Sequence, residues 1–155
     1  DLAWSQLTDC LAIFREIGDK RFSALALERM ADVLCRRGML AEGLAHYEQS
    51  LALWHDLGGQ VGPGRYLARM ARIANTRGKP ESAAHLLGAA EAQRQAAALS
   101  LDALERAEYE RDVASVRAQL DDAAFSAAWA NGRLMNFAQA TDFARGTINE
   151  PRLNQ

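Results

Sequence analysis

Hydrophobic residues recur along the chain at steps of three and four, which is the spacing of one face of an α-helix. The first such stripe consists of Leu27, Met30, Ala31 and Leu34. The second consists of Leu44, Tyr47, Leu51 and Trp54. A glycine follows each stripe, at Gly38 and Gly58, where it can end a helix in the left-handed conformation. The pattern therefore predicts two consecutive helices joined by a short turn.

The same pattern returns forty residues later. Residues 11–45 align with residues 51–85 without a gap, so that "LERMADVLCRRG" lies over "LARMARIANTRG". Identical residues occupy both copies at Leu11/Leu51, Ala12/Ala52, Gly18/Gly58, Leu27/Leu67, Arg29/Arg69, Met30/Met70, Ala31/Ala71, Arg37/Arg77 and Gly38/Gly78. A fixed period of this size is typical of stacked helical hairpins. The repeat predicts an all-α fold.

The glycine-rich stretch "GGQVGPGR", residues 58–65, partly matches the phosphate-binding loop G-x-x-x-x-G-K-[ST]. That loop follows a β-strand, whereas the residues before Gly58 have helical spacing. Arg65 stands where the lysine is needed, and Tyr66 stands where Ser or Thr would hold Mg²⁺. We interpret the stretch as a turn between two hairpins, with glycines at positive φ, and expect no nucleotide binding.

The unit over residues 24–57 resembles a tetratricopeptide repeat. The family's large, small and aromatic steps fall on Leu27, Met30, Ala31, Leu34, Gly38, Gly43, Tyr47 and Ser50. A second unit, residues 64–97, carries the same steps, and residues 1–20 resemble the second half of a preceding repeat. An insertion near residues 58–63 departs from the strict form. The resemblance implies a short superhelical solenoid whose first helices line a concave, partner-binding groove.

A second resemblance covers the C-terminal half. Its pieces are "AAHLLGAAEAQR" at Ala83–Arg94, "ERAEYE" at Glu105–Glu110 and "AFSAAWANGR" at Ala124–Arg133. They are similar to the ends of helical-repeat regions in bacterial LuxR-type transcriptional regulators and related signal-transduction ATPases. The resemblance implies a cytoplasmic signalling context. Because the chain has no initiator Met, we expect it to be part of a longer protein.

Residues 100–146 are predicted to form capping helices, which gives about eight helices in one domain over residues 1–146. Ser100 is the predicted N-cap of the first capping helix, and Asp121 opens the next. Asn136 and Gln139 have capping-box spacing for a last helix near residues 137–145. Residues 147–155 are predicted to be a tail.

Composition excludes several classes of function. Among the 155 residues, 18 Lys and Arg face 20 Asp and Glu, so the net charge is −2 and lacks the basic excess of a nucleic-acid-binding surface. The sequence contains no run of eighteen apolar residues and no signal-peptide pattern. We expect no membrane association and no direct binding of nucleic acid.

Catalytic and metal-binding patterns are also absent from the sequence. The histidines His46, His55 and His85 form no H-E-x-x-H motif, and Cys10 and Cys35 form no C-x-x-C motif. We expect no cofactor, no metal, no disulfide and no enzymatic activity.

The carboxylates Glu105, Glu108, Glu110 and Asp112 alternate with Arg106 and Arg111, which predicts surface ion pairs on a solvated helix face.

The family's groove steps, carried onto this sequence, give the candidate binding residues. They are Glu28, Asp32, Arg36, Arg65, Arg72 and Asn75, which we expect to face solvent. Either the acidic residues of the first unit pair with the arginines of the second, or the arginines capture an anionic partner. We expect a non-catalytic module of a bacterial signalling or transcription-regulating protein that binds a protein, a peptide or a small effector. The alternative is a scaffold or oligomerisation segment with an empty groove.

Overall fold

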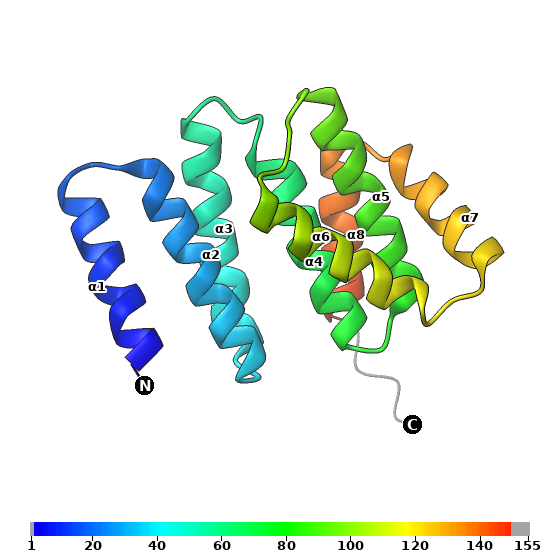
Figure 1. Cartoon of the computed structure of the whole chain (residues 1–155), viewed down its shortest axis with the longest axis horizontal. Helices are drawn as coiled ribbons and strands as arrows, with labels where there is room; N and C mark the ends of the chain where they lie inside the picture. Colours follow the sequence, from blue (N-terminus) through cyan, green and yellow to red (C-terminus); the bar gives the residue numbers. More distant parts are fainter. Residues whose placement is uncertain (1, 150–155) are drawn as a thin grey trace. The chain divides into compact units, whose positions relative to one another are not determined.

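The computed structural model describes residues 2–149, and these residues form eight α-helices and no strand (Figure 1). The helices are α1 (Leu2–Glu16), α2 (Lys20–Arg36), α3 (Leu40–Asp56), α4 (Gly62–Thr76), α5 (Pro80–Ala96), α6 (Ala103–Arg117), α7 (Asp122–Arg133) and α8 (Phe137–Asn149). The predicted all-α fold is confirmed. The chain forms two compact units, one ending at Gly62 and the other beginning at Pro63. The single domain expected over residues 1–146 stays a prediction.

Glycines at positive φ end the helices at regular intervals. Gly18, Gly38 and Gly78 have φ of 73°, 81° and 77°, values that side chains with a Cβ rarely adopt. After each of them the next amide donates back to the helix, from Asp19 to the Phe14 carbonyl at 2.8 Å, from Met39 to the Leu34 carbonyl at 2.9 Å and from Lys79 to the Ala74 carbonyl at 3.0 Å. This is the hydrogen-bond pattern of a Schellman cap.

The stretch "GGQVGPGR" joins two helices, as the sequence predicted. Helix α3 ends at Asp56 and α4 begins at Gly62. Gly58 and Gly59 both have positive φ, at 108° and 75°. The interpretation of this stretch as a turn is therefore confirmed for residues 58–61, whereas residues 62–65 form the first turn of α4.

In the first unit, α2 lies between α1 and α3 and supplies most of the core (Figure 1). Leu27 and Met30 of α2 are buried together with Leu11 of α1. On the other side, Gly43 of α3 lies against the Ala31 carbonyl and the Cys35 side chain. The absence of a side chain at this position lets the two helices of the hairpin approach closely.

In the second unit, α5 is the central helix, and its small residues let neighbouring helices approach it. Its fully buried positions include Ala83, Ala84, Leu86, Leu87 and Ala89. A methyl group at Gly88 would overlap the main chain of Trp129 on α7, and one at Gly132 would overlap the main chain of His85 on α5. Helix α7 continues past Gly132 to Arg133, so the role of Gly132 is close packing and not helix termination.

The helix caps of the C-terminal half are partly those predicted. Asp121 caps α7 through the Ala124 amide, and Asn136 and Gln139 form the expected capping box. The Ser100 cap was wrong. Asp102 caps α6 instead, because the helix begins at residue 103 and the Asp102 carboxylate accepts from the Glu105 amide at 2.8 Å.

Helix α8 continues to Asn149, so the first three residues of the predicted tail are helical. The rest of that tail lies outside the described residues. Within residues 2–149, no helix is long and apolar enough to cross a membrane, and no group of three or more metal-ligating side chains is arranged to hold an ion.

Candidate functional site

Helix α4 places three arginines on one face. Arg65, Arg69 and Arg72 are spaced at i, i+4 and i+7, which brings their side chains into line along the helix. The opposite face of α4 packs into the core of the second unit through Leu67 and Met70. We name the three basic residues the arginine row.

Helix α6 faces the arginine row with three carboxylates, Glu105, Glu108 and Asp112, which we name the acidic row. Arg65 pairs with Glu105. Arg69 Nη2 lies 3.2 Å from Glu108 Oε2. In Arg72, Nε lies 3.1 Å from each carboxylate oxygen of Asp112, and Nη2 lies 2.8 Å from Oδ2. This last contact is two-pronged, the strongest geometry for an arginine and a carboxylate.

Asn75 continues the same interface by one turn. Its Nδ2 donates to Ser115 Oγ at 3.0 Å, and its Oδ1 accepts from Gln119 Nε2 at 2.8 Å. Because Arg65 meets Glu105 and Asn75 meets Ser115, α4 and α6 run in parallel with a constant offset of forty residues. Three of the candidate binding residues thus lie together on α4, where they contact α6 of the same unit. They are Arg65, Arg72 and Asn75.

The offset of forty residues equals the period of the internal repeat. Helix α6 therefore occupies the sequence position of the first helix of a third hairpin. Its core stripe is altered, because Glu110 and Arg111 stand where α4 buries Met70 and Ala71. Val116 is the fully buried side chain of α6. The helix is consequently held by charged contacts more than by apolar burial.

The acidic row corrects the prediction of a solvated helix face. Glu105, Glu108 and Asp112 are half-buried against α4, whereas Glu110 and Arg111 point to solvent. The prediction considered only neighbours on the same helix, and the facing arginines lie forty residues earlier. Ion pairs sheltered in this way are screened by salt less than fully exposed pairs.

Two further candidate residues lie inside the first unit. Glu28 is 3% exposed and Asp32 is 7% exposed, so the expectation that they face solvent was wrong. Glu28 Oε1 accepts from Trp54 Nε1 at 2.9 Å and from Ser50 Oγ at 3.2 Å. Asp32 Oδ1 accepts from the Tyr47 hydroxyl at 2.5 Å. These bonds join α2 to α3.

The donors Tyr47, Ser50 and Trp54 were not predicted to bond to Glu28 and Asp32. Their spacing on α3 matches the spacing of the two carboxylates on α2, which is the signal that could have found them. Arg36 differs from its neighbours: it is exposed in the last turn of α2 and forms no ion pair within residues 2–149.

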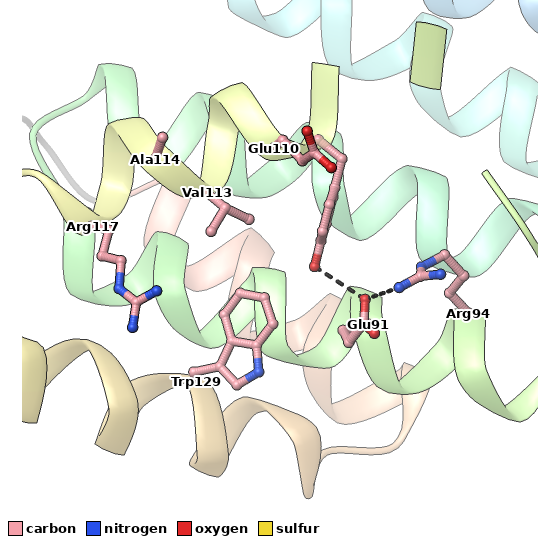
Figure 2. Close-up of a pocket in the computed structure, with 8 residues that line it drawn as sticks. Glu91, Arg94, Glu110, Val113, Ala114, Arg117 and Trp129 are labelled. Atoms are coloured by element: carbon pink, nitrogen blue, oxygen red, sulfur yellow. Dashed lines mark hydrogen bonds and ion pairs between the residues drawn. The ribbon is translucent and has the colours of Figure 1, made fainter. Parts of the chain in front are cut away.

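Helices α5, α6 and α7 border a cavity of about 430 Å³ (Figure 2). Tyr109 lies beside it and donates from its hydroxyl to Glu91 Oε2 at 3.3 Å. Glu91 also pairs with Arg94 and accepts from Gln95 at 2.7 Å. Burial, followed by the nearby Glu91 carboxylate, raises the pKa of Tyr109, so its hydroxyl remains a donor at neutral pH.

Comparison with known families identifies the first two hairpins. Residues 22–96 are a tetratricopeptide-repeat region. The family model covers α2 to α5, just under half of the chain, which confirms the tetratricopeptide resemblance over those residues. No curated protein and no solved structure gives a match. The similarity of the C-terminal half to bacterial regulators stays a prediction.

Proposed function

We propose that the chain is a non-catalytic partner-binding module, and that its binding surface is the arginine row with Asn75. The observation that carries this proposal is the row's present occupant, an acidic helix of the same chain. A surface that already holds a helix with carboxylates at i, i+3 and i+7 has the spacing and the charge to hold a second one. The partner is therefore an acidic helical segment of a protein or peptide.

The contacts of α6 are of a kind that a partner can exchange. Arginine–carboxylate pairs of limited exposure contribute about 1 kcal/mol or less each, and they lose strength as salt rises. An attached helix competes at an effective concentration of about millimolar, so the partner must form additional contacts to replace it. Arg36, an exposed cation of the first unit, stays a candidate contact of that unit by itself. Glu28 and Asp32 serve the hairpin and not the partner.

The wider role we propose is that of an interaction module in a bacterial signalling or transcription-regulating protein. Its support is the resemblance of the three C-terminal sequence pieces. In this fold, the piece "ERAEYE" supplies Glu105 and Glu108 of the acidic row, and the piece "AFSAAWANGR" supplies the close packing at Gly132. Those pieces therefore carry the contacts that fix α6 and α7.

A peptide supplied in trans tests the binding surface. The probe is a fluorescein-labelled peptide with the sequence of residues 102–120, and the receptor is the chain with Glu105→Gln, Glu108→Gln and Asp112→Asn, which loosens α6. We expect this receptor to bind the peptide at least tenfold more tightly than the unmodified chain does. Adding Arg65→Glu and Arg72→Glu to the receptor should abolish binding.

The matched control is the chain with Glu110→Gln and Arg111→Gln, which changes two exposed charges of the same helix. Its affinity for the peptide should equal that of the unmodified chain. Fluorescence anisotropy reports binding, and circular dichroism verifies that each variant is folded. Failure of the loosened receptor to bind the peptide, or binding that ignores the arginine substitutions, would contradict the proposal.

A second candidate function is self-association, and the exposed apolar residues of α1 and of the turn that follows it favour it. Leu2, Ile13 and Ile17 are all well exposed. Light scattering across a range of concentrations would detect an oligomer, and Ile13→Lys with Ile17→Lys should then return it to a monomer. A constant monomer mass would exclude this function.

A further inference from the structure

The cavity of the second unit lies between α6 and α7, and residues of α5 also line it. Figure 2 shows Val113 and Arg117 reaching from α6 toward the space that Trp129 of α7 enters from the other side. Tyr109 and Arg94 close the far end, where the Arg94 guanidinium carbon lies 5.8 Å from the centre of the Tyr109 ring. The volume of about 430 Å³ is in the range of small-molecule sites.

The cavity has a structural cause. Because Gly88 and Gly132 have no side chain, α7 packs closely against α5. The acidic row fixes α6 on α4, and Glu110 replaces the apolar residue that would fill the space between the helices. The two helices that would pair as a third hairpin therefore stay apart, and the rings of Trp129 and Tyr109 remain accessible between them.

Two hydrogen-bond donors of the lining are incompletely used. The Nε of Arg94 is buried and donates to no acceptor within residues 2–149, although its terminal nitrogens engage Glu91 and the Leu99 carbonyl. Arg117 has a long, exposed pairing with Asp122, at 3.7 Å, and its guanidinium carbon lies 4.9 Å from the centre of the Phe125 ring, a contact that uses none of its N–H donors. A buried donor without an acceptor is uncommon in a folded protein and indicates that a further group belongs there.

The acidic residues of the lining do not oppose an anionic ligand. Glu91 already accepts from Tyr109, Arg94 and Gln95, so its charge is compensated. The carboxylate of Glu110 points away from Trp129 and toward solvent (Figure 2). Arg117 is therefore the lining charge whose N–H groups a ligand can approach while the guanidinium stays over the Phe125 ring.

We propose that this cavity binds a small aromatic carboxylic acid. The ring lies against Trp129 and Val113, the carboxylate pairs with Arg117, and a water at the far end of the cavity accepts from Arg94 Nε. Aromatic stacking and a charge-assisted hydrogen bond supply the affinity. The site uses the face of α6 opposite to the acidic row, so it does not rest on the proposed partner binding.

The probe is 4-(trifluoromethyl)phenylacetate, compared with 4-(trifluoromethyl)phenylacetamide, which has the same shape without the charge. Binding to the full chain is followed by fluorine NMR. We expect saturable binding of the acid and at least fivefold weaker binding of the amide. Arg117→Gln should reduce the affinity for the acid to that for the amide, whereas Arg111→Gln, an exposed control on the same helix, should leave it unchanged.

Val113→Trp should abolish binding by filling the cavity. Because that substitution can disturb the packing of α6, a measurement on the unmodified chain accompanies it. In nitrogen-15 correlation spectra, the acid should shift the indole signal of Trp129 and leave those of Trp4 and Trp54 in place. Absence of binding, equal affinity for acid and amide, or shifts confined to Trp4 or Trp54 would overturn the proposal.

Discussion

Arg72 of α4 and Asp112 of α6, which are forty residues apart in the sequence, form a two-pronged ion pair. The Arg72 Nε lies 3.1 Å from both carboxylate oxygens, and Nη2 lies 2.8 Å from one of them. The side chains are 31% and 18% exposed, so the pair is sheltered without being buried. Its geometry makes it the best-defined contact between α4 and α6.

Reversing one charge of this pair should destabilise the second unit, and reversing both should restore it. We expect Arg72→Glu to lower the free energy of unfolding by about 1–2 kcal/mol, because it replaces attraction by repulsion across a sheltered contact. Adding Asp112→Arg should recover at least half of the loss. Urea unfolding of the two single variants and the double variant gives the coupling energy. Arg111→Glu, on the exposed face, should change stability by less than about 0.5 kcal/mol. Strictly additive effects would mean that the pair does not form.

Glu28 holds α2 and α3 together by accepting two hydrogen bonds. We expect Glu28→Ala to cost about 2–4 kcal/mol, because it leaves the buried donors of Trp54 and Ser50 without an acceptor and opens a cavity. Glu28→Gln keeps an acceptor oxygen and should cost clearly less. Chemical unfolding followed by tryptophan fluorescence measures both. Equal losses for the two variants would show that the negative charge of Glu28, and neither its shape nor its capacity to accept hydrogen bonds, explains its role.

The spacing of the hydrophobic residues was sufficient to predict the helices, but it did not predict which charged side chains are exposed. The spacing of Leu27, Met30, Leu67 and Met70 follows directly from helix geometry and survives in any packing of the hairpins. The exposure of a charged residue depends on what packs over it. Glu28 was assigned to the surface because the donors that bury it lie on the next helix, and those donors are polar or amphipathic.

The same reason explains the acidic row. Glu105, Glu108 and Asp112 have the composition of a solvated helix face, and the arginines that cover them belong to a different hairpin. The offset of forty residues was available in the sequence, because it equals the repeat period. It could not be used without knowing that α6 keeps the position of a first helix after losing its core stripe.

The N-cap of α6 is Asp102 and not the predicted Ser100. Asp102 accepts from the Glu105 amide, whereas Ser100 lies two residues before that N-cap. Asp102→Ala should lower the free energy of unfolding by about 1 kcal/mol, and Ser100→Ala should have little effect. Thermal unfolding followed by circular dichroism tests both. A larger effect at Ser100 would restore the original prediction.

The two cysteines should differ in their reaction with iodoacetamide. Cys10 is exposed, whereas burial and the neighbouring Asp32 carboxylate raise the pKa of Cys35 to about 11. Only about one molecule in a thousand then carries the Cys35 thiolate at pH 8, so we expect Cys10 to be modified first. The rate at which Cys35 reacts with iodoacetamide should rise as the pH is raised through 11.

The same pKa difference makes the free energy of unfolding depend on pH. Since an unfolded thiol ionises near pH 9, stability should decline between pH 9 and 11. Asp32→Asn should lower the pKa, and an unchanged profile would exclude Asp32 as a cause.

Glycine at positions 88 and 132 sets the distance between α5 and α7. Alanine is the better helix former by about 1 kcal/mol, so helix propensity alone would make both Gly→Ala changes stabilising. At Gly88 and Gly132, however, the added methyl group meets main-chain atoms of the facing helix, which cannot rotate away as a side chain can. The overlap forces the helices apart, at a cost of about 1–3 kcal/mol or more, and this outweighs the gain.

Gly146 in α8 provides the matched control, because a methyl group there meets no atom within 4 Å. Gly146→Ala should raise the free energy of unfolding by up to about 1 kcal/mol, while Gly88→Ala and Gly132→Ala should both lower it. Urea titrations of the three variants give the comparison under one condition. If all three raised stability alike, helix propensity would govern these positions, and the close approach of α5 and α7 would be incorrect. Opposite signs at Gly146 and Gly88 would establish that contact, because propensity predicts the same sign for both.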